Sequence, residues 1–76
     1  MTEPEQPVRD STTIGRYHIV VTEHVGGRFD GLFAVDVYDR DRHTEGPYRY
    51  AHLNQALMLR DNLAETLRAR VQQDTP

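Results

Sequence analysis

The sequence predicts a small α+β domain, in which a three-stranded antiparallel meander is covered on one face by a C-terminal helix (order β-β-β-α). Residues 53–71 carry apolar side chains at helical spacing, whereas residues 17–25 and 32–39 are strand-like, with mostly apolar side chains at every second position. All five glycines and all four prolines lie outside the interiors of the predicted elements. Because local propensity and pattern agree, the three observations support one architecture.

The composition limits what this domain can be. With 76 residues it has room for one small core, and no cysteine is present to form a disulfide or a thiolate zinc site. No apolar run approaches the roughly 20 residues that span a bilayer, so we expect a soluble, cytoplasmic protein without membrane contact. The net charge is −3, but residues 16–71 hold as many arginines as acids, so neither a basic nucleic-acid footprint nor a phosphate-mimicking surface is present and charge discriminates poorly between partners.

The two ends of the chain are expected to contribute nothing to the core. Residues 1–15 contain Pro4, Pro7 and three acids and have little to bury, so we predict a disordered N-terminal tail. Residues 73–76 are predicted to be a frayed C-terminal tail. The folded domain is then residues 16–72.

In the first two predicted strands the odd-numbered positions are the more apolar, so the odd face should meet the helix. A two-residue turn at the Gly-Gly pair between them would place odd residues beside even ones. A longer loop, roughly residues 26–30, pairs Val21 with Val35 and Ile19 with Val37 and keeps one face dry. We therefore predict the longer loop, although the register across residues 26–31 is not fixed by the pattern.

The rest of the chain supplies the third strand and the helix. Residues 40–46 are predicted to be a polar connection, and residues 47–51 a short edge strand with Pro47 tolerated at its start. His52 lies at the expected helix cap, with Gln55 three residues later. The helix should direct one apolar stripe at the sheet, made by Leu53, Ala56, Leu57, Leu63, Ala64, Leu67 and Val71.

Arg60 is the unusual residue of this helix, since it projects close to the middle of the apolar stripe. Its stem could pack on the sheet while the charged head reaches water past the end of the sheet. Alternatively, the charge could be paired across a subunit interface. The sequence leaves both open.

The sheet face turned away from the helix is the predicted contact surface, because it is too apolar for a purely solvated face and too polar for a second core. We expect a non-catalytic protein-binding module that acts through this face or an edge strand, as a small adaptor, regulator or mobile-element antagonist, and as a possible homodimer. The predicted partner-binding residues are His18, Val20, Thr22, Asp36, Tyr38, Arg40, Arg42 and Arg49.

Neither catalysis nor metal binding is expected. His18 and His24 share a face but lie about 20 Å apart along a strand, which is too far for one metal ion within a subunit. The lone serine, Ser11, falls in the predicted tail, and no lysine is available as a base. His18 and Asp36 could form an acid–base pair, but a domain of this size offers no sheltered pocket. We therefore predict no metal, no cofactor and no enzymatic activity.

Three short segments, residues 16–19, 26–28 and 50–56, occur in an order that resembles the N-terminal arm-type DNA-binding domains of tyrosine recombinases. The resemblance spans about residues 16–71 and implies three strands followed by a helix, with the sheet laid into a DNA groove. This chain departs from that family because its middle is neutral rather than basic. The alternative function is therefore DNA binding, with phosphate contacts from Arg16, Arg28, Arg40, Arg42 and Arg49.

Overall fold

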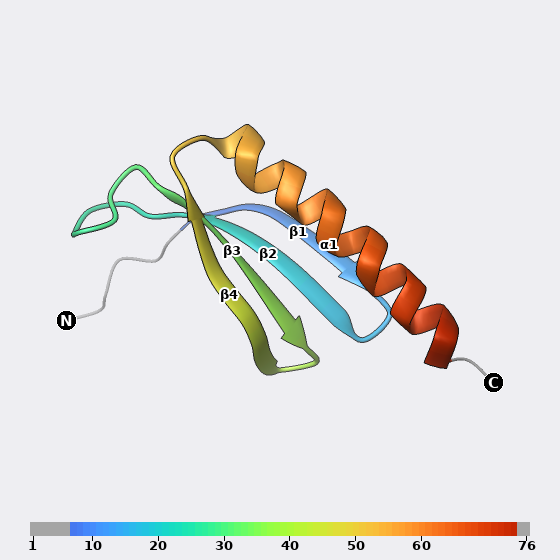
Figure 1. Cartoon of the computed structure of the whole chain (residues 1–76). Helices are drawn as coiled ribbons and strands as arrows, with labels where there is room; N and C mark the ends of the chain where they lie inside the picture. Colours follow the sequence, from blue (N-terminus) through green and yellow to red (C-terminus); the bar gives the residue numbers. More distant parts are fainter. Residues whose placement is uncertain (1–6, 75–76) are drawn as a thin grey trace.

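The computed structural model describes residues 7–74, with the backbone alone for Asp74, as one four-stranded antiparallel sheet with a helix packed on one face (Figure 1). The strands follow one another in chain order across the sheet, as a meander. The elements are β1 (Val8–Ile14), β2 (Tyr17–Glu23), β3 (Phe33–Asp39), β4 (Arg42–Tyr50) and α1 (Leu53–Asp74). The α+β class with a C-terminal helix is confirmed, but the sheet has four strands and not three.

The additional strand is β1, which lies in the segment predicted to be a disordered tail. Thr12, Thr13 and Ile14 are β-branched residues that favour strands, and Gly15 adopts φ +57°, which permits a two-residue turn into Tyr17. Ile14 is only 8% exposed and belongs to the core. The prediction was wrong for residues 8–14, and residues 1–6 lie outside the described part of the chain.

The third predicted strand was also misplaced. Residues 40–46, expected to form a polar connection, are instead a tight turn at Arg40 and Asp41 followed by the first half of β4. β4 is nine residues long and takes up two register shifts against β3, so its side chains do not keep a simple two-residue alternation. Because of these register shifts, apolar and polar residues do not alternate along β4, and alternation is the pattern from which a strand is predicted.

The pairing of β2 with β3 follows the prediction. Ile19 lies opposite Val37 and Val21 opposite Val35, and the strands are joined by a long loop with glycines at positive φ. Within this loop the backbone N–H of Gly26 donates to Asp30 Oδ1 at 2.6 Å, which fixes the turn. One dry face and one outer face result, as the parity of the two segments indicated.

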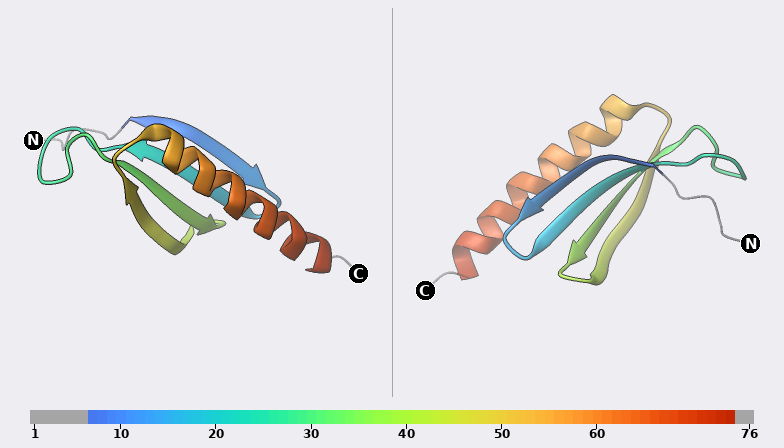
Figure 2. Two further views of the ribbon diagram at one scale, coloured as in Figure 1. Left: turned by 45° about the horizontal axis from the view of Figure 1, so that its top comes forward. Right: turned by 180° about the vertical axis from the view of Figure 1, so that it is seen from behind.

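Helix α1 runs alongside β1, which is an edge strand of the sheet (Figure 2). Arg60 contacts Asp10 near the start of β1, and a Cβ atom on Gly15 would lie 3.1 Å from the Val71 side chain near its end. From Asp10 to Gly15 a strand advances about 16 Å. From Arg60 to Val71 a helix also advances about 16 Å, so the two elements stay side by side over this length.

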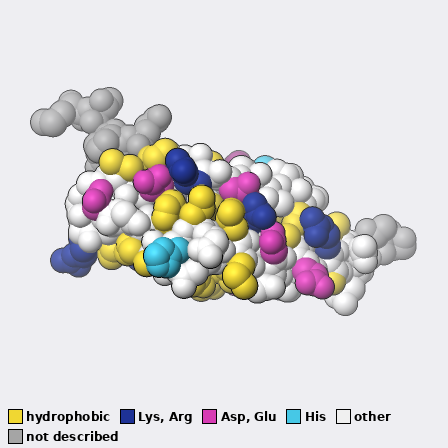
Figure 3. Space-filling view, turned by 90° about the horizontal axis from the view of Figure 1, so that it is seen from above, with side chains coloured by type: hydrophobic (Ala, Val, Ile, Leu, Met, Phe, Trp, Pro, Cys, Tyr) yellow, Lys and Arg dark blue, Asp and Glu magenta, His cyan; other side chains and the backbone are white. Residues whose placement is uncertain are grey.

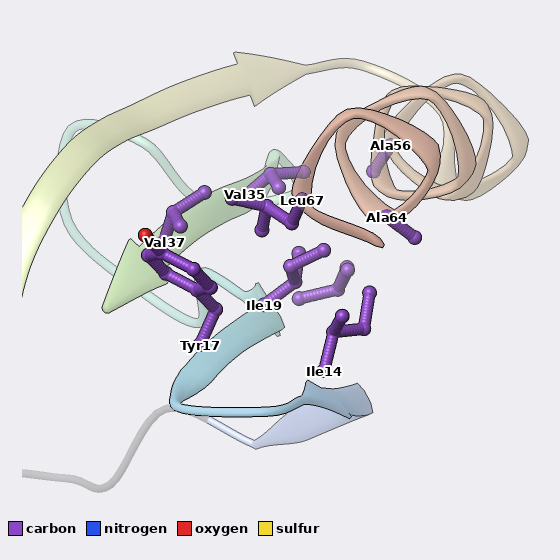
Figure 4. Close-up of a cluster of buried hydrophobic side chains, with 9 residues drawn as sticks. Ile14, Tyr17, Ile19, Val35, Val37, Ala56, Ala64 and Leu67 are labelled. Carbon is purple, nitrogen blue, oxygen red and sulfur yellow. The ribbon is translucent and has the colours of Figure 1, made fainter. Parts of the chain in front are cut away.

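The core lies between α1 and the inner face of the sheet (Figure 4). The side chains predicted to be dry are so, except that Phe33 is only half-buried; Leu67 is the fully buried leucine of α1, with Leu57 and Leu63 half-buried. Tyr17 is also buried, at 4% exposure. The buried cluster comprises Ile14, Tyr17, Ile19, Val21, Val35, Val37, Ala56, Ala64 and Leu67.

The helix begins where the sequence indicated and ends three residues later than predicted. The backbone N–H of His52 donates to Gln55 Oε1 at 3.3 Å, which is one half of a capping box. The helix continues through Asp74, so it includes two residues of the predicted frayed tail, while residues 75 and 76 are outside the described chain. No helix among the described residues is long and apolar enough to cross a membrane.

Arg60 is paired within the chain, across the junction between α1 and β1. Its guanidinium lies 2.8 Å from Asp10 Oδ2 and 2.7 Å from Asp61 Oδ1, and these hydrogen bonds raise the pKa of Arg60 further above its ordinary value. Thr12 donates to the same Asp10 oxygen at 3.2 Å. The partner for this charge was missed because Asp10 was assigned to a disordered tail.

We expect the Arg60–Asp10 pair to contribute a coupling free energy of about 0.5–1 kcal/mol, since both side chains are only partly exposed. Urea unfolding of Arg60→Met, Asp10→Asn and the double variant would measure it. The Arg9–Glu23 pair is the control, because it is longer, at 3.5 Å, and Arg9 is 47% exposed. Equal coupling in the two pairs would show that Arg60 does not hold β1 against the helix.

Candidate binding surface

The outer face of the sheet, turned away from α1, carries the predicted contact residues of β2 and β3. Cross-strand partners lie on the same face, so the register assigns residues of all four strands to this surface. The outer face consists of Val8, Ser11 and Thr13 of β1, His18, Val20 and Thr22 of β2, Ala34, Asp36 and Tyr38 of β3, and His43 and Arg49 of β4.

One end of the outer face is a row of polar rings. Thr13 Oγ1 and His18 Nδ1 are hydrogen-bonded at 3.1 Å. The Tyr38 and His43 rings meet edge to face, with centroids 5.2 Å apart. His43 Nε2 donates to Asp36 Oδ1 at 2.9 Å, so the acid of this face is held by a neighbouring strand. These contacts hold the rings in place, and Tyr38 remains half-buried.

The other end is built around an aromatic ring from the loop between β2 and β3. The guanidinium carbon of Arg49 lies 3.9 Å from the centre of the Phe29 ring, a close cation–π contact. The His24 ring is tilted against the same phenylalanine at 5.6 Å. His24 Nε2 is buried without a hydrogen-bond partner among the described residues. Ala34, opposite Arg49 in the sheet, is 1% exposed.

The structure does not bring all eight predicted contact residues together. Arg40 lies in the turn that joins β3 and β4, with φ +59°. Arg42 is opposite Asp39, which faces the helix side of the sheet together with Tyr17. The remaining six, His18, Val20, Thr22, Asp36, Tyr38 and Arg49, all lie on the outer face.

Sequence reasoning missed Phe29 and His43 as members of this surface. Phe29 was placed in a loop, and only the folding of that loop brings its ring over Arg49. His43 was placed in a polar connection. The tight turn at Arg40 and Asp41 instead brings it opposite Tyr38 in the sheet, where the two rings meet. Predicting a two-residue hairpin turn between Asp39 and Arg42 would have placed His43 on this surface.

No group of three or more His, Cys, Asp or Glu side chains among the side chains of residues 7–73 could hold a metal ion. A hollow of about 620 Å³ is an open depression along the exposed side of α1, between Asn62 and Gln73. At Tyr48 the nearby Glu45 carboxylate raises the pKa of the phenol, which makes it a weaker acid rather than an activated one.

Comparison with known proteins adds no family to this description. A scan against protein-family models, a search of curated proteins and a search of solved structures each gave no match to the chain. The resemblance to arm-type recombinase domains therefore rests on the order of elements alone, and β1 adds a strand that this order does not contain.

Proposed function

We propose that this protein is a non-catalytic protein-binding module whose contact surface is the outer face of the sheet. The observation that carries the proposal is that α1 covers only one face of the sheet (Figure 2). The register places aromatic, aliphatic and histidine side chains on the opposite face. A sheet face of this kind is either a solvated surface or a recognition surface. Its composition supports the second.

The outer face has the residue types that are enriched where proteins meet. It includes Tyr38, Arg49 and Val20, and within the set of residues defined above Asp36 is the one acid. Interface cores are enriched in tyrosine and arginine and depleted in lysine and glutamate. The charged residues gather elsewhere: the side of the molecule that includes α1 shows acidic and basic side chains alternating along its length (Figure 3).

The positions of the arginines favour a protein partner over DNA. Arg28 lies in the loop between β2 and β3, whereas Arg40 lies at the opposite end of the strands (Figure 1). Arg16 is paired with Asp39 at 3.1 Å, and Arg49 is engaged with Phe29. Phosphate binding by a sheet needs several free cations on one surface, and these arginines are dispersed and partly neutralised.

The proposal is tested by covalent capture in cells of the native host. A photoreactive amino acid at Val20, in the middle of the outer face, is expected to crosslink a partner protein that the same probe at Thr66 of α1 does not capture. The partner identified in this way should bind Tyr38→Ala about tenfold or more weakly, because tyrosines are common hot spots. Glu65→Ala, on the opposite side of the molecule, should bind as the parent does.

Two results would overturn this function. Crosslinks from Thr66 and none from Val20 would place the contact on the helix. Binding of duplex DNA that weakens steeply with salt, by contrast, would favour the nucleic-acid alternative, because counterion release dominates such complexes.

A further inference from the structure

We propose that the free edge of β1 binds the β1 strand of a second copy of this chain, so that two sheets join into one continuous antiparallel sheet. The two-fold axis of this dimer passes through Thr12. The dimer uses the backbone groups of this edge, whereas the side chains of the outer face would contact the partner protein. The homodimer can therefore be tested without that partner.

The two edges of the sheet differ in their capacity to accept another strand. β4 contains two register shifts and Pro47, features that block pairing at an edge. In β1 the one irregularity lies between Val8 and Asp10, and residues 10–14 pair with β2 without interruption. This run has no Pro, Gly or Lys. Its inward-pointing acid, Asp10, is already paired with Arg60.

The backbone groups on the free edge follow from the turn. In a two-residue hairpin the flanking residues, here Ile14 and Tyr17, form a hydrogen-bonded pair, and hydrogen-bonded and open pairs then alternate. Thr12 therefore bonds to β2, whereas the N–H and C=O groups of Ser11 and Thr13 point away from the sheet. Both side chains are exposed. These two residues form the pairing edge.

A two-fold axis at Thr12 brings the outward backbone groups of one β1 strand opposite the same groups of the second copy. It places Ser11 opposite Thr13 of the partner subunit, twice, and each such pair exchanges both of its backbone hydrogen bonds. This register uses all of residues 10–14. Other registers that match outward groups use fewer residues of this run or include the irregularity at Arg9.

The same two-fold axis also brings together the α1 helices of the two copies, and their charged side chains are complementary. A groove of about 380 Å³ lies over β1 and is lined by Thr12, Arg60, Asp61, Ala64 and Arg68. Because α1 runs alongside β1, pairing the two strands antiparallel also brings the two helices together antiparallel (Figure 2). Ala64 lies between Asp61 and Arg68 along the helix, and its small side chain is buried against the sheet, so it does not project into the groove. Asp61 then faces Arg68 of the partner subunit, and the reverse pair forms across the axis.

Both charged groups are available for this contact. The Asp61 side chain is 67% exposed, and Arg60 contacts its Oδ1 atom, which leaves Oδ2 for a second cation. Arg68 is exposed and forms no ion pair with any of the described side chains, which are those of residues 7–73. A five-residue strand and two helical turns make a small interface, so we expect a dissociation constant on the order of 10–100 µM.

A charge exchange tests the arrangement with the full-length protein. In sedimentation equilibrium, Arg68→Asp alone and Asp61→Arg alone should each self-associate at least about tenfold more weakly than the parent, because like charges then meet across the axis. An equimolar mixture of the two variants should recover a dimer, since every cross-axis pair is again opposite in charge. Arg70→Asp is the control: this residue lies over the Tyr17 ring, away from the groove, and its reversal should leave association unchanged.

Amide exchange supplies a second measurement that does not depend on charge. The N–H groups of Ser11 and Thr13 should exchange more slowly as protein concentration rises, by about tenfold across the association range. Circular dichroism would establish that every variant is folded. A parent protein that stays monomeric at 1 mM, a variant mixture that does not associate, or exchange at Ser11 and Thr13 that ignores concentration would each overturn the dimer.

Discussion

Replacing Gly46 with alanine is expected to destabilise the protein by about 3–5 kcal/mol, which leaves little of the stability of a domain this small. Gly46 adopts φ +93°, a conformation that costs an L-residue about 1–3 kcal/mol. In addition, a Cβ atom here would collide with the carbonyl oxygen of Val35, and would lie 3.2 Å from Asp36 Cα. Both are backbone atoms of β3, so no side-chain rotation relieves the contact.

The matched control is Gly27→Ala in the loop between β2 and β3. Gly27 also has a positive φ, +75°, but a Cβ atom there meets nothing within 4 Å. We expect it to cost about 1 kcal/mol, from backbone strain alone. Thermal unfolding followed by circular dichroism would separate the two, at roughly 4–8 °C per kcal/mol. Similar losses in both variants would mean that the approach of β4 to β3 at Gly46 is unimportant.

Gly46 also shows why the sheet was only partly predictable from sequence. The bulges of β4 add residues that pair with nothing in β3, so polar and apolar side chains stop alternating from Arg42 to Tyr50. A reading based on alternation recognises only the regular end of that strand. The turn at Arg40 was hidden for a similar reason, since a non-glycine residue supplies the positive φ.

β1 was missed for a different physical reason. Apart from Val8 and Ile14 its side chains are polar, so it carries almost no hydrophobic signal. Its place is fixed by tertiary contacts, namely pairing with β2 and the bond between Asp10 and Arg60. The regular strands β2 and β3, in contrast, bury the central residues of one face each. For them the alternation of side chains predicted the pairing of Ile19 with Val37 and of Val21 with Val35, and the face that meets α1.

The candidate surface was predictable to the same extent as the strands that carry it. His18, Val20, Thr22, Asp36 and Tyr38 were assigned to one face by parity alone, and the register places them there. Residues contributed by turns could not be placed in this way. Phe29 reaches Arg49 only through the path of its loop. The tight turn leaves Arg40 in the connection itself and puts Arg42 on the face that meets α1.

The second large effect is expected at Leu67, the one leucine of α1 that is fully buried, at 2% exposure. Leu67→Ala should cost about 2–5 kcal/mol, because it removes buried methyl groups and leaves a cavity against the sheet. Its side chain points into the cluster formed by Ile19 and Val35 (Figure 4), whose β-branched side chains have little freedom to fill the space. The measurement is urea unfolding, with the slope checked for two-state behaviour.

Met58→Ala is the control on the same helix, since Met58 is 65% exposed and alanine is an equally good helix former. We expect it to change stability by less than about 0.5 kcal/mol. The contrast matters because the sequence has no cysteine and therefore no disulfide, so packing between α1 and the sheet has to supply much of the stability of this small domain. If Leu67→Ala were tolerated as well as Met58→Ala, α1 would not be held by its buried face. The outer face would then lack the fixed scaffold that recognition by a sheet surface requires.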